Sequence, residues 1–188
     1  MMWKRIFSVV APAACLVLTG YGQAVALNPL VEDEDAVSEP AIVGTWQDTD
    51  GSLAFVVRQT GPAEYEIGFG KENDDGAWRM RLIRINGELL ADLSSKPPAH
   101  TLLVPVHIFV RVRLGQDWLR VAFFREQWLQ DQIKGPGGPA YAVVDGDVIL
   151  TGSTAELQDF VGGYIHAAQA FDEEDEFRRV EDAEKKPE

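Results

Sequence analysis

The middle of the chain alternates between apolar and polar side chains, and this alternation restricts the fold more than any other feature of the sequence. In the stretch 63–69, Tyr65, Ile67 and Phe69 share one side and two glutamates lie on the other. A period of two residues is typical of a strand with one buried face. The pattern predicts strands over residues 42–46, 53–59, 63–69, 78–82, 88–93, 104–114 and 118–124.

Turn signals separate these predicted strands at intervals of roughly ten residues. Asn86-Gly87 is the strongest, because both residues tolerate the positive φ of a type I′ hairpin turn. Thr60-Gly61-Pro62 and Gly115-Gln116-Asp117 mark two further turns. The sequence therefore predicts a mainly β fold, an antiparallel meander that closes into a small barrel, with accessory helices.

Two helices are predicted after the strands. The first covers 125–134 and ends at the Gly- and Pro-rich stretch 135–139. The second begins at Ser153, which forms a capping box with Glu156. Its apolar residues recur every three or four positions, so we expect it to pack against the barrel. Gly162-Gly163 inside it predicts a break or a close backbone approach.

The first residues have the form of an export signal. Lys4 and Arg5 precede an apolar run that is too short to cross a membrane as a helix. Small residues in Ala24-Val25-Ala26 predict cleavage before Leu27, with cleavage after Ala24 as the second choice. Residues 1–26 are thus a predicted signal peptide, and we expect an exported protein that is periplasmic or secreted.

A membrane anchor depends on a single cysteine. The stretch Leu18-Thr19-Gly20-Tyr21 resembles a lipoprotein signal in which tyrosine replaces the acylated cysteine. Cys15 lies inside the apolar run and is a poor match for that position. A membrane-anchored lipoprotein therefore requires acylation of Cys15, and a soluble product is the favoured interpretation.

Acidic residues dominate the charge, with 30 Asp and Glu against 17 Lys and Arg. Such a chain repels phosphate backbones, so we expect no nucleic-acid partner. Acidic stretches predict a linker over 27–40 and a disordered tail over 172–188, which leaves one domain over 41–171. A third acidic stretch, 72–75, is read as a hairpin loop and not as a cation site.

The first predicted strand carries a short motif, Gly44-Thr45-Trp46. It resembles the Gly-x-Trp opening of lipocalin-like barrels, in which the indole closes the barrel base. The resemblance implies a barrel that can carry a small ligand. An arginine normally packs on that tryptophan in the family, but Arg178 and Arg179 fall in the predicted tail and are not expected to reach it.

A second resemblance covers most of the chain after residue 27. It is to a group of uncharacterised bacterial envelope lipoproteins, and it implies an envelope location without a known reaction. The stretches that carry it are 28–30, 44–46, 103–112, 117–119 and 150–160.

Catalytic and metal-binding motifs are not found. His100, His107 and His166 lack the spacing of a metal site. Ser153 lacks a nucleophile elbow and serves better as a helix cap. We therefore expect a protein that is not an enzyme and that has no metal and no cofactor.

His107 interrupts a strand whose other face is formed by valines, with Phe109, Arg111 and Arg113 on its own side. If the valine face is outside, this second face lines an interior suited to an anionic, partly apolar ligand. If the valine face is the core, the same groups form a polar exterior, with His107 bound to a cross-strand carboxylate. The second interpretation is favoured. Together the predicted ligand-binding residues are Trp46, Phe55, Tyr65, Trp78, His107, Phe109 and Arg111.

Two functions remain open. A lipocalin-like carrier or sensor of a small hydrophobic or anionic ligand predicts a concave pocket. An interaction or structural module of the envelope, which binds another envelope protein, predicts a filled barrel and an exposed apolar patch. Trp128, Leu129 and Ile133 are the candidate patch, with core packing as the alternative. The volume of the interior distinguishes the two.

Overall fold

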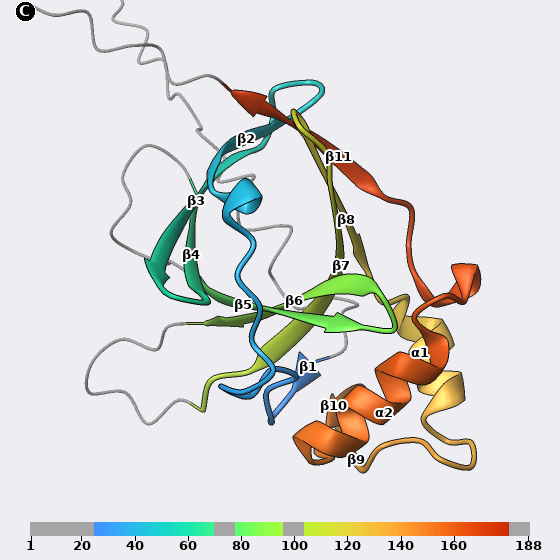
Figure 1. The fold of residues 1–188 in the computed structure, drawn as a ribbon. Coiled ribbons are helices and arrows are strands. Elements are labelled where there is room, and N and C mark those ends of the chain that lie inside the picture. The colour runs from blue at the N-terminus through green and yellow to red at the C-terminus, as the bar shows by residue number, and fades with distance from the viewer. Residues whose placement is uncertain (1–24, 70–77, 96–103, 181–188) are drawn as a thin grey trace, which may run out of the picture.

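Eight strands form a closed antiparallel barrel in the computed structural model, which describes residues 25–69, 78–95 and 104–180 (Figure 1). Neighbouring strands are mostly consecutive in sequence, and pairing of β6 with β7 completes the ring. The mainly β fold with accessory helices is thereby confirmed. The barrel strands are β2 (Gly44–Asp48), β3 (Ala54–Gly61), β4 (Glu64–Phe69), β5 (Trp78–Ile85), β6 (Glu88–Ser95), β7 (His107–Leu114), β8 (Trp118–Phe123) and β11 (Asp175–Val180).

The predicted hairpin at Asn86-Gly87 joins β5 to β6, and both residues have positive φ angles, 50° and 88°. A second hairpin of the same kind was not predicted. Asp145 and Gly146, with φ angles of 52° and 99°, join β9 (Tyr141–Val144) to β10 (Asp147–Leu150). An Asp-Gly pair between two β-branched runs is a strong hairpin signal, so the sequence contained this information.

The two predicted helices lie outside the barrel (Figure 1). They are α1 (Glu126–Gln132) and α2 (Thr154–Tyr164), and Ser153 caps α2 with the predicted capping box. Gly162 makes a close backbone approach: a Cβ there would lie 3.2 Å from Ile85, and the Gly162 carbonyl accepts a hydrogen bond from Asn86. The remaining short elements are β1 (Val25–Ala26), η2 (Pro40–Ile42) and η3 (Ala168–Ala170).

The last barrel strand, β11, lies in the stretch predicted as a disordered tail. That prediction is wrong for residues 175–180, which pair with both β2 and β8. The acidic composition misled it, because most of the charged side chains of β11 have partners on the barrel. Glu176, for example, lies 2.7 Å from the Arg120 guanidinium.

The stretch predicted as an acidic linker is also packed. Leu30 and Val31 are fully buried, and the Leu30 amide donates a 2.8 Å hydrogen bond to the buried carboxylate of Asp92. Thr154 and Gln158 of α2 donate hydrogen bonds to the carbonyls of residues 29 and 30. The acidic side chains that follow are mostly exposed. The prediction of a linker relied on these acidic residues and overlooked Leu30 and Val31, which anchor the segment.

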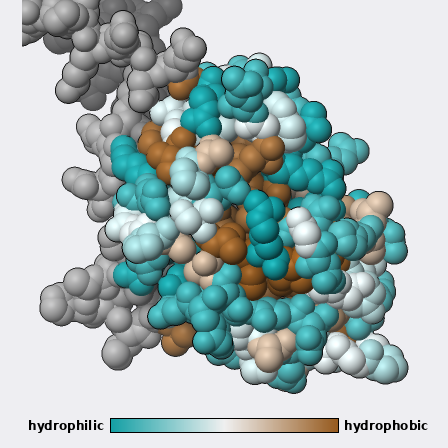
Figure 2. All heavy atoms as spheres, in the orientation of Figure 1, coloured by the Kyte–Doolittle hydropathy of each residue, from teal (hydrophilic) through white to brown (hydrophobic). Residues whose placement is uncertain are grey.

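The buried side chains form two separate clusters. One fills part of the barrel interior and includes Trp46, Tyr65 and Val112. The other lies between the outer face of strands β5 to β8 and the layer formed by α1, α2, β1 and β10, and it includes Phe109 and Leu157. Most of the visible surface is hydrophilic, with hydrophobic side chains showing near the middle of the face drawn in Figure 2.

None of the helices among the described residues has the length and hydrophobicity that a membrane span requires.

Candidate functional site

The barrel interior contains a cavity of about 630 Å³. That volume falls within the range of small-molecule sites, about 300–1,000 Å³. Its wall is apolar because alternate residues of each strand point inward. The apolar side chains that line it are Ile42, Leu53, Phe55, Val57, Ile67, Phe69, Met80, Ala91, Leu93, Val110, Val112, Leu119, Val121, Phe123 and Phe177.

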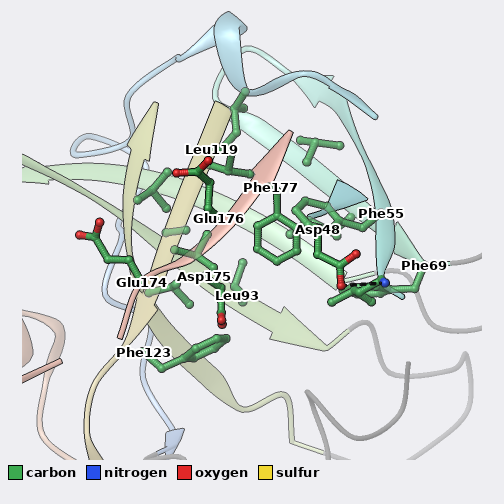
Figure 3. Close-up of a pocket in the computed structure, with 18 of the residues that line it drawn as sticks. Asp48, Phe55, Phe69, Leu93, Leu119, Phe123, Glu174, Asp175, Glu176 and Phe177 are labelled. Atoms are coloured by element: carbon green, nitrogen blue, oxygen red, sulfur yellow. Dashed lines mark hydrogen bonds between the residues drawn. The ribbon is translucent and has the colours of Figure 1, made fainter. Parts of the chain in front are cut away.

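Three phenylalanines stand together on one side of the cavity (Figure 3). The rings of Phe55 and Phe177 meet edge to face with centroids 5.0 Å apart, and Phe55 lies 6.0 Å from Phe69. Such aromatic pairs hold their rings in defined positions. They give the cavity one stiff apolar wall.

The closed end of the barrel is built on Trp46 of β2. Its indole is fully buried, and Nε1 donates a 2.9 Å hydrogen bond to the Ile42 carbonyl of η2. The guanidinium of Arg179 lies over the indole, 4.3 Å from the ring centroid. It also donates hydrogen bonds to the carbonyls of Val43 and Ala41, at 2.7 and 2.6 Å. One cation thus ties β11, β2 and η2 together beneath the cavity.

Gly44 is required for this closure. Its φ is +144°, and a Cβ at this position would collide with the Arg179 guanidinium. The expectation that no arginine reaches Trp46 is therefore wrong. It failed because Arg179 was assigned to a tail, whereas β11 pairs Arg179 with Trp46 in register.

The open end of the cavity carries acidic side chains. Asp48, Asp50, Glu174, Asp175 and Glu176 line it there, and among the described lining residues none is Lys, Arg or His. Asp48 accepts hydrogen bonds from the Ser52 hydroxyl at 2.6 Å and from the Leu53 amide at 3.0 Å. These donors, the Ser52 hydroxyl foremost, hold the pKa of Asp48 below its usual value.

Asp175 is the inward-pointing acid of β11. Its side chain extends into the pocket, whereas Glu174 and Glu176 lie on the other side of the strand (Figure 3). Partial burial, with the nearby charge of Asp172 as a second cause, raises the pKa of Asp175. Both effects disfavour the ionised carboxylate. A positive charge placed beside Asp175 would therefore stabilise its ionised form.

Of the predicted ligand-binding residues, Phe55 alone lines the cavity. Trp46 lies beneath it at the closed end. Tyr65 is buried nearby, and its hydroxyl accepts a 2.7 Å hydrogen bond from the Glu39 amide. Trp78 begins β5 and packs against the interior cluster without lining the cavity. The aromatic residues of the prediction therefore belong mostly to the walls and base.

The valine face of β7 is the inner face, since Val110 and Val112 line the cavity. The interpretation that placed His107, Phe109 and Arg111 inside is therefore wrong. Phe109 is buried in the outer cluster instead. The alternation itself allows either choice, and the helices that cover Phe109 were needed to decide it.

His107 and Arg111 have partners outside the barrel. His107 Nδ1 lies 2.7 Å from the Asp92 carboxylate on the neighbouring strand, which confirms the predicted cross-strand partner. Arg111 stacks on Phe171, with its guanidinium 4.1 Å from the ring centroid, and contacts Glu174 at 3.2 Å. Arg111 thus fastens the segment that precedes β11 to the barrel, and His107 contacts the carboxylate that holds the Leu30 amide.

The predicted surface patch around Trp128 is packed. Leu129 and Ile133 are buried, and the Trp128 ring contacts Phe124 and Tyr164 with centroids 6.4 and 5.0 Å apart. Core packing, the alternative interpretation, accounts for these residues. No group of His, Cys, Asp and Glu side chains within the described ranges is arranged to hold a metal ion.

Sequence reasoning missed several cavity residues. Phe177 was assigned to the tail, and its signal was weak because acidic residues precede it and two arginines follow.

Comparison of the chain with profiles of known protein families, with curated proteins and with solved structures found no match. The geometry of the cavity is therefore the basis for the functional proposal.

Proposed function

We propose that this protein is a carrier or sensor of a small, largely apolar ligand, held inside the barrel as in lipocalin-like proteins. The observation that carries the proposal is the interior cavity of about 630 Å³ with its apolar wall. A protein that used the barrel purely as a scaffold gains stability from a filled interior, because protein cores are close-packed. The Gly44-x-Trp46 base with Arg179 over the indole adds a lipocalin-like feature. The proposed role is binding without catalysis.

A variant that fills the cavity tests this function. Ala91 lines the cavity, so Ala91→Leu places a larger side chain in the space that the ligand occupies. Ala155→Leu makes the same change at an exposed position of α2 and serves as the matched control. Binding of decanol, a neutral apolar probe, is measured by titration calorimetry.

We expect the parent protein and Ala155→Leu to bind decanol with equal affinity and Ala91→Leu to bind at least tenfold more weakly. Absence of decanol binding to the parent protein would overturn the proposal. So would equal binding by the two variants.

One observation favours a second function, the presentation of a sheet edge to another protein. All four residues of β9 are exposed, Val143 by 59%, and β9 pairs with β10 alone among the described strands. Free edges accept a further strand. If β9 docks an envelope partner, Val143→Lys abolishes that association and leaves decanol binding unchanged; an unchanged association with the partner rejects this function.

We also propose that the protein is exported, as a periplasmic or secreted protein. β1 pairs with β10 and β7, and Ala26 is buried. Cleavage after Ala26 would remove this strand, so the pairing supports cleavage after Ala24. Mass spectrometry of the mature N-terminus tests this: a chain beginning at Val25 supports it, one beginning at Leu27 contradicts the site, and an acylated Cys15 would establish a membrane tether.

A further inference from the structure

The ionisable side chains of the described cavity lining are all acidic. The alternation of β7 and β8 turns Arg111, Arg113 and Arg120 to the outside of the barrel, where each contacts a glutamate. The acidic residues at the open end remain as the ionisable groups of the described lining. An anion inside the cavity would find no basic side chain among these residues.

Two of the lining acids are already neutralised from outside. Glu174 contacts Arg111 and Arg113 at 3.2 and 2.8 Å, and Glu176 contacts Arg120 and Arg178 at 2.7 and 2.6 Å. Their carboxylates point away from the side of β11 that carries Phe177 (Figure 3). These glutamates hold β11 to its neighbours and do not need a ligand.

Asp48 and Asp175 differ from the two glutamates because no described cation contacts them. Asp48 uses one carboxylate oxygen for Ser52 and Leu53, while its Oδ1 is buried without a hydrogen-bond partner in the described part of the chain. The carboxylate of Asp175 forms no hydrogen bond or ion pair with the described residues, and it points into the pocket beside the apolar wall. A buried carboxylate oxygen without a partner is costly.

We propose that the ligand is a cationic amphiphile, whose apolar body fills the barrel and whose amine or ammonium group lies at the open end between Asp48 and Asp175. This inference rests on the proposed carrier function and specifies its ligand class. It replaces the expectation of an anionic ligand, because the arginines that motivated that expectation lie outside. Attraction of a cation to two carboxylates that no described cation contacts, at the end of an apolar cavity, favours this class over neutral and anionic analogues.

Three ligands with the same ten-carbon chain test the inference: decyltrimethylammonium, decanol and decanoate. Each is titrated calorimetrically below its micelle concentration at physiological salt. We expect the ammonium to bind at least tenfold more tightly than decanol, and decanoate to bind more weakly than decanol. Decanol binding with no preference for the ammonium would overturn this inference and leave the carrier function standing. Absence of binding by all three would overturn the carrier function itself.

Charge-removing variants locate the ammonium group. Asp175→Asn keeps the shape of the side chain, and we expect it to lower ammonium affinity at least fivefold without changing decanol affinity. Asp48→Asn is expected to act in the same direction. Asp159→Asn, on the exposed face of α2, changes the net charge equally and is the matched control. Equal losses in Asp175→Asn and Asp159→Asn would show that overall charge, and not the mouth, attracts the cation, and would overturn the site.

Discussion

The interior of the barrel and the part of its outer face that α1 and α2 cover differ in how completely they are packed. Inside, the wall borders a cavity of about 630 Å³, whereas the space lined by residues of α1, α2 and the strands beneath them is about 20 Å³. The same strands contribute to both faces, since Val110 points inward and Phe109 outward. The difference indicates that the cluster beneath the helices is close-packed, whereas the barrel interior contains free volume.

Truncation of one leucine on each face is expected to give the largest contrast. Leu157 of α2 is fully buried in the outer cluster, and Leu93 lines the cavity. We expect Leu157→Ala to lower the free energy of unfolding by about 2–5 kcal/mol, since it creates a new void in a close-packed cluster. Leu93→Ala should cost less, because its side chain already borders open space. Urea unfolding measures both, and equal costs would contradict the proposed difference in packing.

The closed end provides the second test. Arg179→Met removes the cation over Trp46 and its two hydrogen bonds to backbone carbonyls. Hydrogen bonds from charged groups are worth about 1.5–3 kcal/mol, and we expect a loss of stability of about that size. Arg178→Met, the adjacent residue of β11, removes surface ion pairs and should cost under about 1 kcal/mol. Similar losses in thermal unfolding would show that the base does not depend on Arg179.

Enlarging one alanine on each face tests the same difference in packing by adding atoms instead of removing them. Ala122 belongs to the outer cluster and Ala91 lines the cavity. Ala122→Leu should destabilise the protein by about 1–3 kcal/mol through overpacking. Ala91→Leu should leave the stability nearly unchanged, because its side chain extends into open space. Denaturant midpoints distinguish the two, and an equal loss in Ala91→Leu would mean that the cavity is closed to added atoms.

The smallest expected effect concerns pH. Because the folded-state pKa of Asp175 is raised, its ionisation opposes folding, and this cost is present above the folded-state pKa and absent below the usual value of 3.8. Asp175→Asn should therefore stabilise the protein slightly at pH 7 and have no effect near pH 3. Thermal unfolding at both pH values checks the sign, and destabilisation at pH 7 would contradict it.

The barrel could be predicted because alternation and turn chemistry are local properties. The stretch 63–69 and the Asn86-Gly87 turn each identify their own structure without reference to distant residues. The site could not be predicted in the same way. Which face of β7 is inside depends on α2, and the closure of the base depends on the pairing of Arg179 with Trp46 across most of the chain. Acidic segments were the main source of error, because salt bridges satisfy charges that composition assigns to solvent.

The position of β11 also determines when the protein can finish folding. Val180 pairs with Thr45, so one edge of β2, the first barrel strand, stays unpaired until β11 has been synthesised. During synthesis, β2 to β8 emerge long before that partner does, and their two outer edges stay open in the meantime. Contacts between such distant residues slow folding and expose unpaired strands to aggregation. A chain whose synthesis ended just before residue 175 would therefore lack the strand that joins β2 to β8 and closes the barrel.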